Sequence, residues 1–314
     1  MSSFVKSMLR MGMAALVALA FTTACKKVEK GPKIPTDLDG WILYTTTDGE
    51  EVNFWSDAEA NRCIDDYGYA YYDETKGVRY LHLKDIPEDF TGGFYNWANL
   101  KTIDLSHVDF SHCTKMDNLF YMTAVEKVVM SGLDLSSMKS MEKMFLECEN
   151  LKEVKMDGLD ISNVESLAGM FEGCTGIETV DFSGVKSNRC SNIYAMFFNC
   201  RSLKSYDLGP IGKYPLEATM GMFNRCTSLE TIDLSGMNFA PHDNPSSSRI
   251  YAMLSYTTPS VVKIPASLTT DMGMASALYG VESDGTLYHP KGTDPLYALA
   301  NLQRDGHKWK AVEY

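Results

Sequence analysis

Hydrophobic residues recur along this chain at a nearly fixed interval. The phenylalanines at the centre of the pattern are Phe94, Phe120, Phe145, Phe171, Phe197 and Phe223, at intervals of 26, 25, 26, 26 and 26 residues. A cysteine lies three residues after each of the last four, in the stretches MFLEC, MFEGC, MFFNC and MFNRC. A fixed period of this length is typical of solenoids, in which neighbouring units bury their apolar faces by stacking. We therefore expect a structural ladder in the core, formed by Phe145, Phe171, Phe197, Phe223, Cys148, Cys174, Cys200 and Cys226.

Within each unit, one stretch alternates between apolar and polar residues. In LKTIDLSH, which begins at Leu100, Ile103 and Leu105 point one way while Thr102 and Asp104 point the other. Related stretches follow in later units, for example IETVDFSG and LETIDLSG. This alternation predicts a strand with one buried face in every unit.

A second stretch of each unit has a longer hydrophobic period. Val164, Leu167 and Phe171 lie at i, i+3 and i+7, a spacing that places apolar side chains on one face of a helix. Ser162 and Glu165, three residues apart, match a capping box at its start. The repeat unit is therefore predicted to be strand, turn, short helix and turn.

The repeated motif M-F-x-x-C-x-x-L-x-x-[IV]-D-[LF]-S resembles that of BspA-like leucine-rich-repeat surface lipoproteins. The resemblance implies an α/β fold, a leucine-rich-repeat solenoid of ~26-residue strand-turn-helix units with caps at both ends. It also implies that the strands line a concave sheet and the helices form the convex back. In the family, this architecture serves adhesion and contact with proteins of a host or a neighbouring cell.

The flanks of the array predict caps. Residues 38–77 are expected to form an N-terminal β cap, with a hairpin over residues 41–55 that turns at Asp48 and Gly49. The solenoid is predicted over residues 78–267. Residues 268–314 are predicted as a C-terminal cap, within which residues 285–309 resemble the closing segment of the family, a strand followed by a last helix.

The N-terminus has the features of a secretory signal peptide over residues 1–24. Lys6 and Arg10 precede an apolar run at residues 11–21, which is too short for an ordinary membrane span. The following TTAC resembles the lipobox of bacterial lipoproteins, which makes Cys25 the expected lipidation site; the alternative is plain cleavage with an incidental thiol. Residues 25–37 are expected to be a lipidated tether. The resemblance places the protein on the bacterial outer membrane, surface-exposed or facing the periplasm.

Composition and motifs argue against several functions. A net charge of −12 does not favour binding to nucleic acid or to anionic lipid. Neither G-x-S-x-G nor H-E-x-x-H occurs, so no catalytic residue is assigned and a non-enzymatic protein is predicted. A column of single thiols does not surround a metal ion tetrahedrally, and no metal or cofactor is expected. Disulfides along the column are the alternative to free thiols, but parallel side-chain vectors favour a reduced packing ladder.

The polar side of the predicted strands is the candidate partner-binding face. Its aspartates have three interpretations: hydrogen bonds to the backbone in the turn, calcium binding, or contact with a basic partner. The partner is expected to be a protein. The candidate residues are Thr102, Asp104, Ser106, Lys127, Val129, Glu153, Lys155, Thr179, Asp181, Ser205, Asp207, Thr231 and Asp233.

A second function remains open from the sequence. Tyr67, Tyr69 and Tyr71 alternate and would present one aromatic face, either to a glycan or to the core of the cap. Exposure of these rings near Trp41 or Trp55 would favour a glycan-binding lipoprotein of an outer-membrane uptake system. Their burial against the first repeat would favour a cap.

Overall fold

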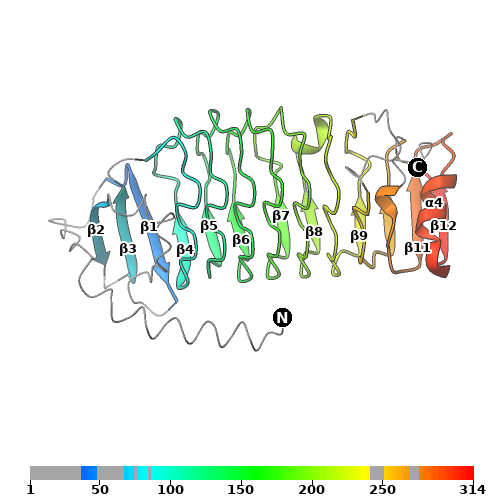
Figure 1. Ribbon diagram of the computed structural model, residues 1–314, viewed down its shortest axis with the longest axis horizontal. Helices are drawn as coiled ribbons and strands as arrows, with labels where there is room; N and C mark the ends of the chain where they lie inside the picture. Colours follow the sequence, from blue (N-terminus) through cyan, green and yellow to red (C-terminus); the bar gives the residue numbers. More distant parts are fainter. Residues whose placement is uncertain are drawn as a thin grey trace.

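The protein is a stack of similar coils closed by different elements at its two ends (Figure 1). The computed structural model describes residues 37–47, 67–73, 76–83, 86–240, 251–266, 268 and 276–314. Its strands are β1 (Trp41–Thr46), β2 (Tyr67–Asp73), β3 (Val78–Leu83), β4 (Leu100–Asp104), β5 (Lys127–Val129), β6 (Glu153–Lys155), β7 (Thr179–Asp181), β8 (Ser205–Asp207), β9 (Thr231–Asp233), β10 (Val261–Lys263), β11 (Gly285–His289) and β12 (Trp309–Glu313). Its helices are the α-helix α4 (Leu296–Leu302) and the short 3-10 helices η2 (Ile211–Lys213), η3 (Ser276–Leu278) and η4 (Arg304–Gly306).

The N-terminal strands enter the stack in an antiparallel arrangement. β1 pairs antiparallel with both β3 and β4, and the sheet has the order β2-β3-β1-β4-β5-β6. β3, which opens the predicted repeat region, is therefore separated from β4 by β1. The parallel ladder begins between β4 and β5.

From β4 onward, each coil lies in parallel register on the next. Ile103 lies beside Val128, which lies beside Val154, so apolar side chains of equivalent positions stack. Isolated parallel bridges continue the contact at other corners of the coil, for example between Ser140 and Ser166 and between Asp134 and Asp160. The prediction of a repeat solenoid is confirmed, and the arrangement is a β-solenoid.

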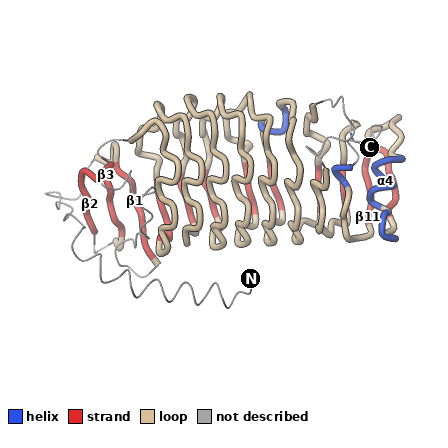
Figure 2. The backbone as a smooth tube through the Cα atoms, viewed as in Figure 1, coloured by secondary structure: helices blue, strands red, loops and turns tan. Residues whose placement is uncertain are grey.

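The predicted helix is absent from the described coils, so the α/β leucine-rich-repeat class with strand-turn-helix units is wrong. Figure 2 shows the coils as short strands joined by loops, with the one described α-helix, α4, at the C-terminal end. Over the stretch that contains Phe171, the Met170 amide donates to the Leu167 carbonyl and the Cys174 amide to the Phe171 carbonyl. The Glu172 amide also bonds within the turns, to the Gly169 carbonyl, whereas the Phe171 and Gly173 amides donate to the next coil, to Met196 at 2.9 Å and to Phe198 at 2.8 Å. A helix would use these amides internally, whereas two successive turns leave them free to join the coils.

Each double turn needs two residues with positive φ, one two positions before the central aromatic residue and one two positions after it. Around Phe171 these are Gly169 at 63° and Gly173 at 77°. This conformation costs little for glycine and is tolerated by asparagine. The same two columns contain Gly92, Asn96, Asn118, Met122, Lys143, Glu147, Ala195, Asn199, Gly221, Arg225, Ala252 and Tyr256.

The stack is nearly straight in the view of Figure 1. A layer of helices, each about 10 Å wide, spreads one side of a repeat more than strands about 4.8 Å apart spread the other. Here both sides of each coil are extended or turning chain at the same spacing. The solenoid therefore lacks the difference in width that would bend it.

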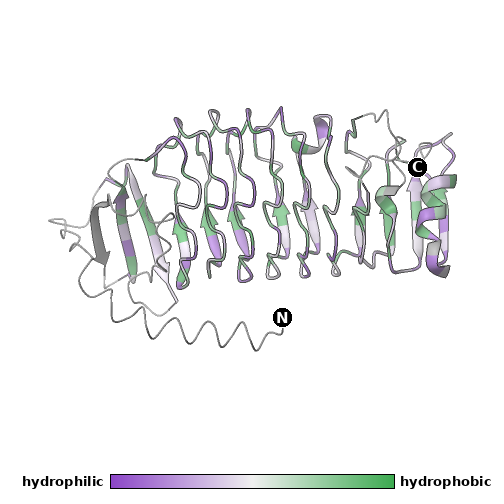
Figure 3. Ribbon diagram, viewed as in Figure 1, coloured by the Kyte–Doolittle hydropathy of each residue, from purple (hydrophilic) through white to green (hydrophobic). Residues whose placement is uncertain are grey.

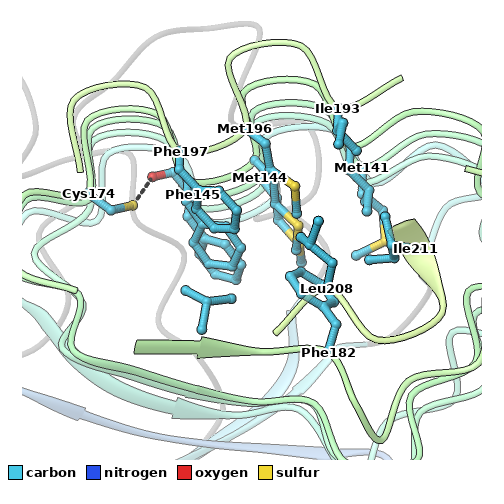
Figure 4. Packing of buried hydrophobic residues seen from close by; sticks show 14 of the residues in the cluster. Met141, Met144, Phe145, Cys174, Phe182, Ile193, Met196, Phe197, Leu208 and Ile211 are labelled. Atoms are coloured by element: carbon cyan, nitrogen blue, oxygen red, sulfur yellow. Dashed lines mark hydrogen bonds between the residues drawn. The ribbon is translucent and has the colours of Figure 1, made fainter. Parts of the chain in front are cut away.

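The core of the stack contains a column of aromatic rings, and the Cys174 thiol lies beside it (Figure 4). The rings of Phe120 and Phe145 stack with centroids 5.4 Å apart, and those of Phe145 and Phe171 at 5.3 Å. The Cys174 thiol donates to the Phe145 carbonyl at 3.1 Å, and the Cys200 thiol to the Phe171 carbonyl at 3.0 Å. Figure 3 shows hydrophobic and hydrophilic positions interspersed along the coils, as rows of side chains alternate between core and solvent. The completely buried ladder positions are Phe145, Phe171, Phe197, Phe223, Cys148, Cys174, Cys200 and Cys226.

Candidate binding surfaces

The strands place the candidate partner-binding residues in two parallel columns on the outer side of the sheet. Thr102 lies beside Lys127 and Lys127 beside Glu153, while Asp104 lies beside Val129. The side chains are half-buried from Thr102 to Val129 and exposed from Glu153 to Asp233. We call these two columns, with Ser106, the strand face.

The N-terminal half of the strand face is largely neutralised by its own ion pairs. Lys127 Nζ lies 2.7 Å from Glu153 Oε2, and Lys155 Nζ lies 3.9 Å from Glu153 Oε1. Thr102 shares a hydrogen bond of 2.7 Å with Thr45 of β1. These groups are already engaged with one another, which leaves this half with little unpaired charge.

The aspartates of the strand face hold the turn that follows each strand. Asp181 Oδ1 accepts a hydrogen bond of 2.7 Å from the Ser183 amide, and Asp207 Oδ1 accepts one of the same length from the Gly209 amide. Hydrogen bonds from Ser183 lower the pKa of Asp181, so this carboxylate is charged at neutral pH. One oxygen of each carboxylate thus accepts a backbone hydrogen bond in the turn. Of the three interpretations of these aspartates, this geometry matches hydrogen bonding to the backbone.

The C-terminal half of the strand face is acidic. Asp181 and Asp207 are directly opposite each other on β7 and β8, and neither forms an ion pair within the described residues. Asp233, on β9, has Lys263 Nζ at 3.7 Å. Hydroxyl groups of Thr179, Ser205 and Thr231 line the neighbouring column. This half therefore presents charge and hydroxyl groups to solvent without cations of its own until Lys263.

A third column, immediately before the strand face in each coil, alternates in charge. Lys152 Nζ lies 2.8 Å from Glu126 Oε2, and Lys204 Nζ lies 2.7 Å from Glu178 Oε2. The hydrogen bond from Lys152 is the main cause that lowers the pKa of Glu126. We call it the alternating column; its members are Lys101, Glu126, Lys152, Glu178, Lys204 and Glu230.

On the double turns, the structure brings together residues that the sequence analysis did not select. We call these positions the turn face. In each coil it runs from three residues before the central residue to four residues after it; the central residue is a Phe in most coils and Leu254 in the last. In the coils of Phe145 and Phe171 the turn face has four glutamates and one lysine (EKMFLECE and AGMFEGCT). In the coils of Phe197, Phe223 and Leu254 it has no Asp, Glu or Lys (YAMFFNCR, MGMFNRCT and YAMLSYTT).

Aromatic and guanidinium groups dominate that second half of the turn face. Tyr194, Tyr251 and Tyr256 are 43%, 42% and 52% exposed. The guanidinium of Arg225 lies over the Tyr256 ring, 5.4 Å from its centroid. Interface cores are enriched in Tyr, Phe, Met and Arg and depleted in Lys, Glu and Asp. The available sequence signal was that Tyr194 and Tyr251 share one offset from the central residue of their coils, and Arg225 and Tyr256 share another.

The core thiols are chemically quiet. Burial raises the pKa of Cys148 to about 12 and holds the pKa of Cys174 and of Cys200 well above the usual value of a thiol. Thiolate is the nucleophilic and metal-binding form of cysteine, so these groups are inert at neutral pH. None of the cysteines in the described part of the chain forms a disulfide. These cysteines are Cys113, Cys148, Cys174, Cys190, Cys200 and Cys226.

Several sequence predictions fall outside the described residues. These are the signal peptide, Cys25, most of the tether, the Asp48–Gly49 turn, Trp55 and the side chains of Tyr67, Tyr69 and Tyr71. Because these tyrosine side chains are not described, a glycan site and a packed cap both stay predictions. Within the described part of the chain, no three His, Cys, Asp or Glu residues are grouped to hold a metal ion. No helix in that part is long and apolar enough to cross a membrane.

Parallel coils, a continuous ring column and exposed polar rows define a β-solenoid repeat protein. Residues 88–209, which contain the regular coils from β4 to β8, match the model of a family described as "Mycoplasma protein of unknown function, DUF285". No curated protein matches the chain, and no solved structure does. The family match and the solenoid both fit a repeat surface protein. The closer resemblance to BspA-like lipoproteins stays a prediction.

Proposed function

We propose that this protein is a non-enzymatic binding protein of the cell envelope, which contacts a protein partner through its strand face. The observation that carries the proposal is the acidic half of that face, where Asp181 and Asp207 stand opposite each other in exposed, parallel register. Their backbone is fixed by the stacked coils, so little conformational entropy is lost on binding. Carboxylates on adjacent strands repel each other, and basic side chains of a partner relieve that repulsion.

The expected partner is a protein surface that presents Lys or Arg side chains. A row of similar groups along a flat face suits an extended contact, whereas catalysis needs different groups that converge on one point. In this proposal the chain is lipidated at Cys25, and the tether holds the solenoid away from the outer membrane. The side of the membrane on which the chain lies is tested together with the lipid anchor.

Capture of envelope and matrix proteins by the full-length chain tests the strand face. Asp181→Lys combined with Asp207→Lys is expected to reduce capture of a specific partner at least about tenfold, because two like charges then face a basic surface. The matched control is Glu165→Lys, the same type of charge change at an exposed residue outside the strand face. Equal capture by both variants would contradict a role for the strand face.

Lipid anchoring has a separate test. Cells labelled with an alkyne fatty acid are expected to transfer the label to the wild-type chain and not to Cys25→Ser. Digestion of intact cells by an added protease then reports the membrane side, since a surface-exposed chain is cut and a periplasmic one is not. Label on Cys25→Ser at the wild-type level would contradict lipidation at this residue.

A further inference from the structure

The turn face of the Phe197, Phe223 and Leu254 coils carries aromatic rings that are open to solvent. We call this part of the turn face the aromatic half. Tyr194, Met220 and Tyr251 have the same offset on three successive coils, so they form one row along the stack. The two tyrosines of the row are exposed and Met220 is half-buried. Tyr251 also stacks on Tyr279 of the following coil, with ring centroids 5.3 Å apart.

Two guanidinium groups are the only formal charges among the residues of the aromatic half. Arg201 Nε donates to Asn199 Oδ1 at 2.8 Å, and the Arg225 guanidinium lies over the Tyr256 ring. Among the described residues, neither arginine has a carboxylate within ion-pair distance. On a chain with a net charge of −12, this patch therefore presents two positioned cations without counter-ions.

The aromatic half and the strand face lie on opposite sides of the core. Figure 4 shows the rings of Phe145 and Phe197 between the turns and the strands of their coils. The strands that follow the Phe197 and Phe223 turns end in Asp207 and Asp233. These coils are therefore acidic on the strand side and basic on the turn side, and the two sides suit ligands of opposite charge.

We propose that the aromatic half docks a short acidic segment of a protein, whose Asp or Glu side chains pair with Arg201 and Arg225. Arginine binds a carboxylate through two parallel hydrogen bonds, and Tyr and Arg carry much of the binding energy of protein interfaces. Apolar side chains of the segment would lie on the row of Tyr194, Met220 and Tyr251. The occupant leaves the strand face free, so this site is separate from the proposed partner-binding face.

The size of the aromatic half favours a segment rather than a broad folded surface. Two steps of about 4.8 Å separate its first and last coils, a length of about 10 Å, which three residues of extended chain span at about 3.3 Å each. A standard interface of about 800 Å² per partner is, as a square, about 28 Å across. The four glutamates on the turn face of the Phe145 and Phe171 coils would repel a longer acidic partner.

A polypeptide also suits the chemistry of the aromatic half better than a glycan does. Sugar hydroxyl groups donate hydrogen bonds, and the aromatic half has no carboxylate to accept them. Its accessible apolar groups include Phe198, Met220 and Ala252, which match apolar side chains of a peptide.

Peptide selection tests the chemistry of the occupant. The probe is a phage library of random dodecapeptides, selected on the full-length chain in detergent. Counter-selection on Tyr251→Ala combined with Arg225→Gln removes peptides that bind elsewhere, because this variant keeps the strand face. The retained peptides are expected to contain Asp and Glu at least about twice as often as the starting library. Retained peptides without this excess would overturn the proposal.

Fluorescence anisotropy with the most enriched peptide then tests the arginines. Arg201→Gln and Arg225→Gln are each expected to raise the peptide Kd roughly tenfold, through loss of a charge-assisted hydrogen bond. Lys213→Gln, on η2 and outside the turn face, loses the same charge and should leave the Kd unchanged. Circular dichroism verifies that each variant is folded.

Two results of these titrations contradict the assignment. If Arg225→Gln binds the peptide as tightly as Lys213→Gln does, the arginine does not pair with the peptide. If a heparin oligosaccharide displaces the peptide and itself binds more tightly, the occupant is an anionic glycan and not a protein segment.

Discussion

Gly173 offers the sharpest test of the double turn, because a helix and a turn predict opposite signs for the same substitution. The residue has a φ of 77°, and a Cβ added to it would lie 3.3 Å from Glu147 Cα. Alanine in this conformation costs about 1–2 kcal/mol. Alanine also restricts the unfolded chain more than glycine does, which stabilises the folded protein by about 0.4–1 kcal/mol. Gly173→Ala should therefore destabilise the protein by about 1 kcal/mol, with the close backbone contact adding to that cost, whereas in a helix interior it would stabilise by about 1 kcal/mol.

Gly236→Ala is the matched control. Gly236 has no positive φ, and its added Cβ would meet nothing within 4 Å. The same substitution there should stabilise the protein by about 0.4–1 kcal/mol. Urea unfolding of both variants and the wild type, followed by circular dichroism and by tryptophan fluorescence, measures the two free-energy changes at equal m-values. A Gly173→Ala protein as stable as Gly236→Ala would refute the account of the double turn.

Three further predictions concern the core and the surface columns. Burial raises the pKa of Cys148 from 9.0 to about 12 and holds those of Cys174 and Cys200 well above 9.0. The stability that the neutral, buried thiols contribute is therefore complete below pH 9 and is lost progressively as the pH rises above it. The free energy of unfolding should fall by about 1.4 kcal/mol per pH unit for each such thiol, and Cys174→Ala should remove one share of that slope; equal slopes would contradict it. Phe171→Ala interrupts the ring column and should cost about 3–5 kcal/mol in urea unfolding, whereas a cost below about 1 kcal/mol would show that the column does not stabilise the stack. Lys152→Glu places a third carboxylate between Glu126 and Glu178 and should lower the urea midpoint at low salt and less at high salt; an effect independent of salt would exclude charge as the cause.

The repeat period and the strands could be predicted because both follow from hydrophobic spacing alone. Ile103, Val128 and Ile232 face the core as alternation requires. Once the period is known, stacking fixes which residues are neighbours. The antiparallel pairing of β1 with β3 and β4 could not be predicted from the period, because β1 lies outside the repeats and the period therefore does not indicate its neighbours.

The helix was predicted wrongly because successive turns give nearly the same apolar spacing as a helix. Leu167, Phe171 and Cys174 lie three or four residues apart in either case. The distinguishing signal was the residue type between them: Gly169 and Gly173 stand where a left-handed residue is needed. Ser162, expected to cap the helix, instead donates its hydroxyl to Asp160.

The strand face could be proposed from the sequence because polar residues alternate with core residues there. The turn face was missed because its members lie in the stretch that was predicted to be a helix. Exposed Tyr and Arg residues are common on the solvent side of a helix and do not by themselves indicate a binding surface. Arg201 and Arg225 also occupy different offsets from their Phe, four and two residues after it. Arg225 has the same offset as Tyr256, but only the stacked coils place Arg201 on the same surface.

The alternating column limits how such an array changes in length. Loss of the single coil that carries Glu126 would place Lys101 beside Lys152, and every later contact would keep its sign. Loss or duplication of two adjacent coils leaves every neighbour opposite in charge. Stacks of this type should therefore lengthen and shorten most readily in pairs of coils, which makes the two-coil segment, rather than the single repeat, the unit of inheritance.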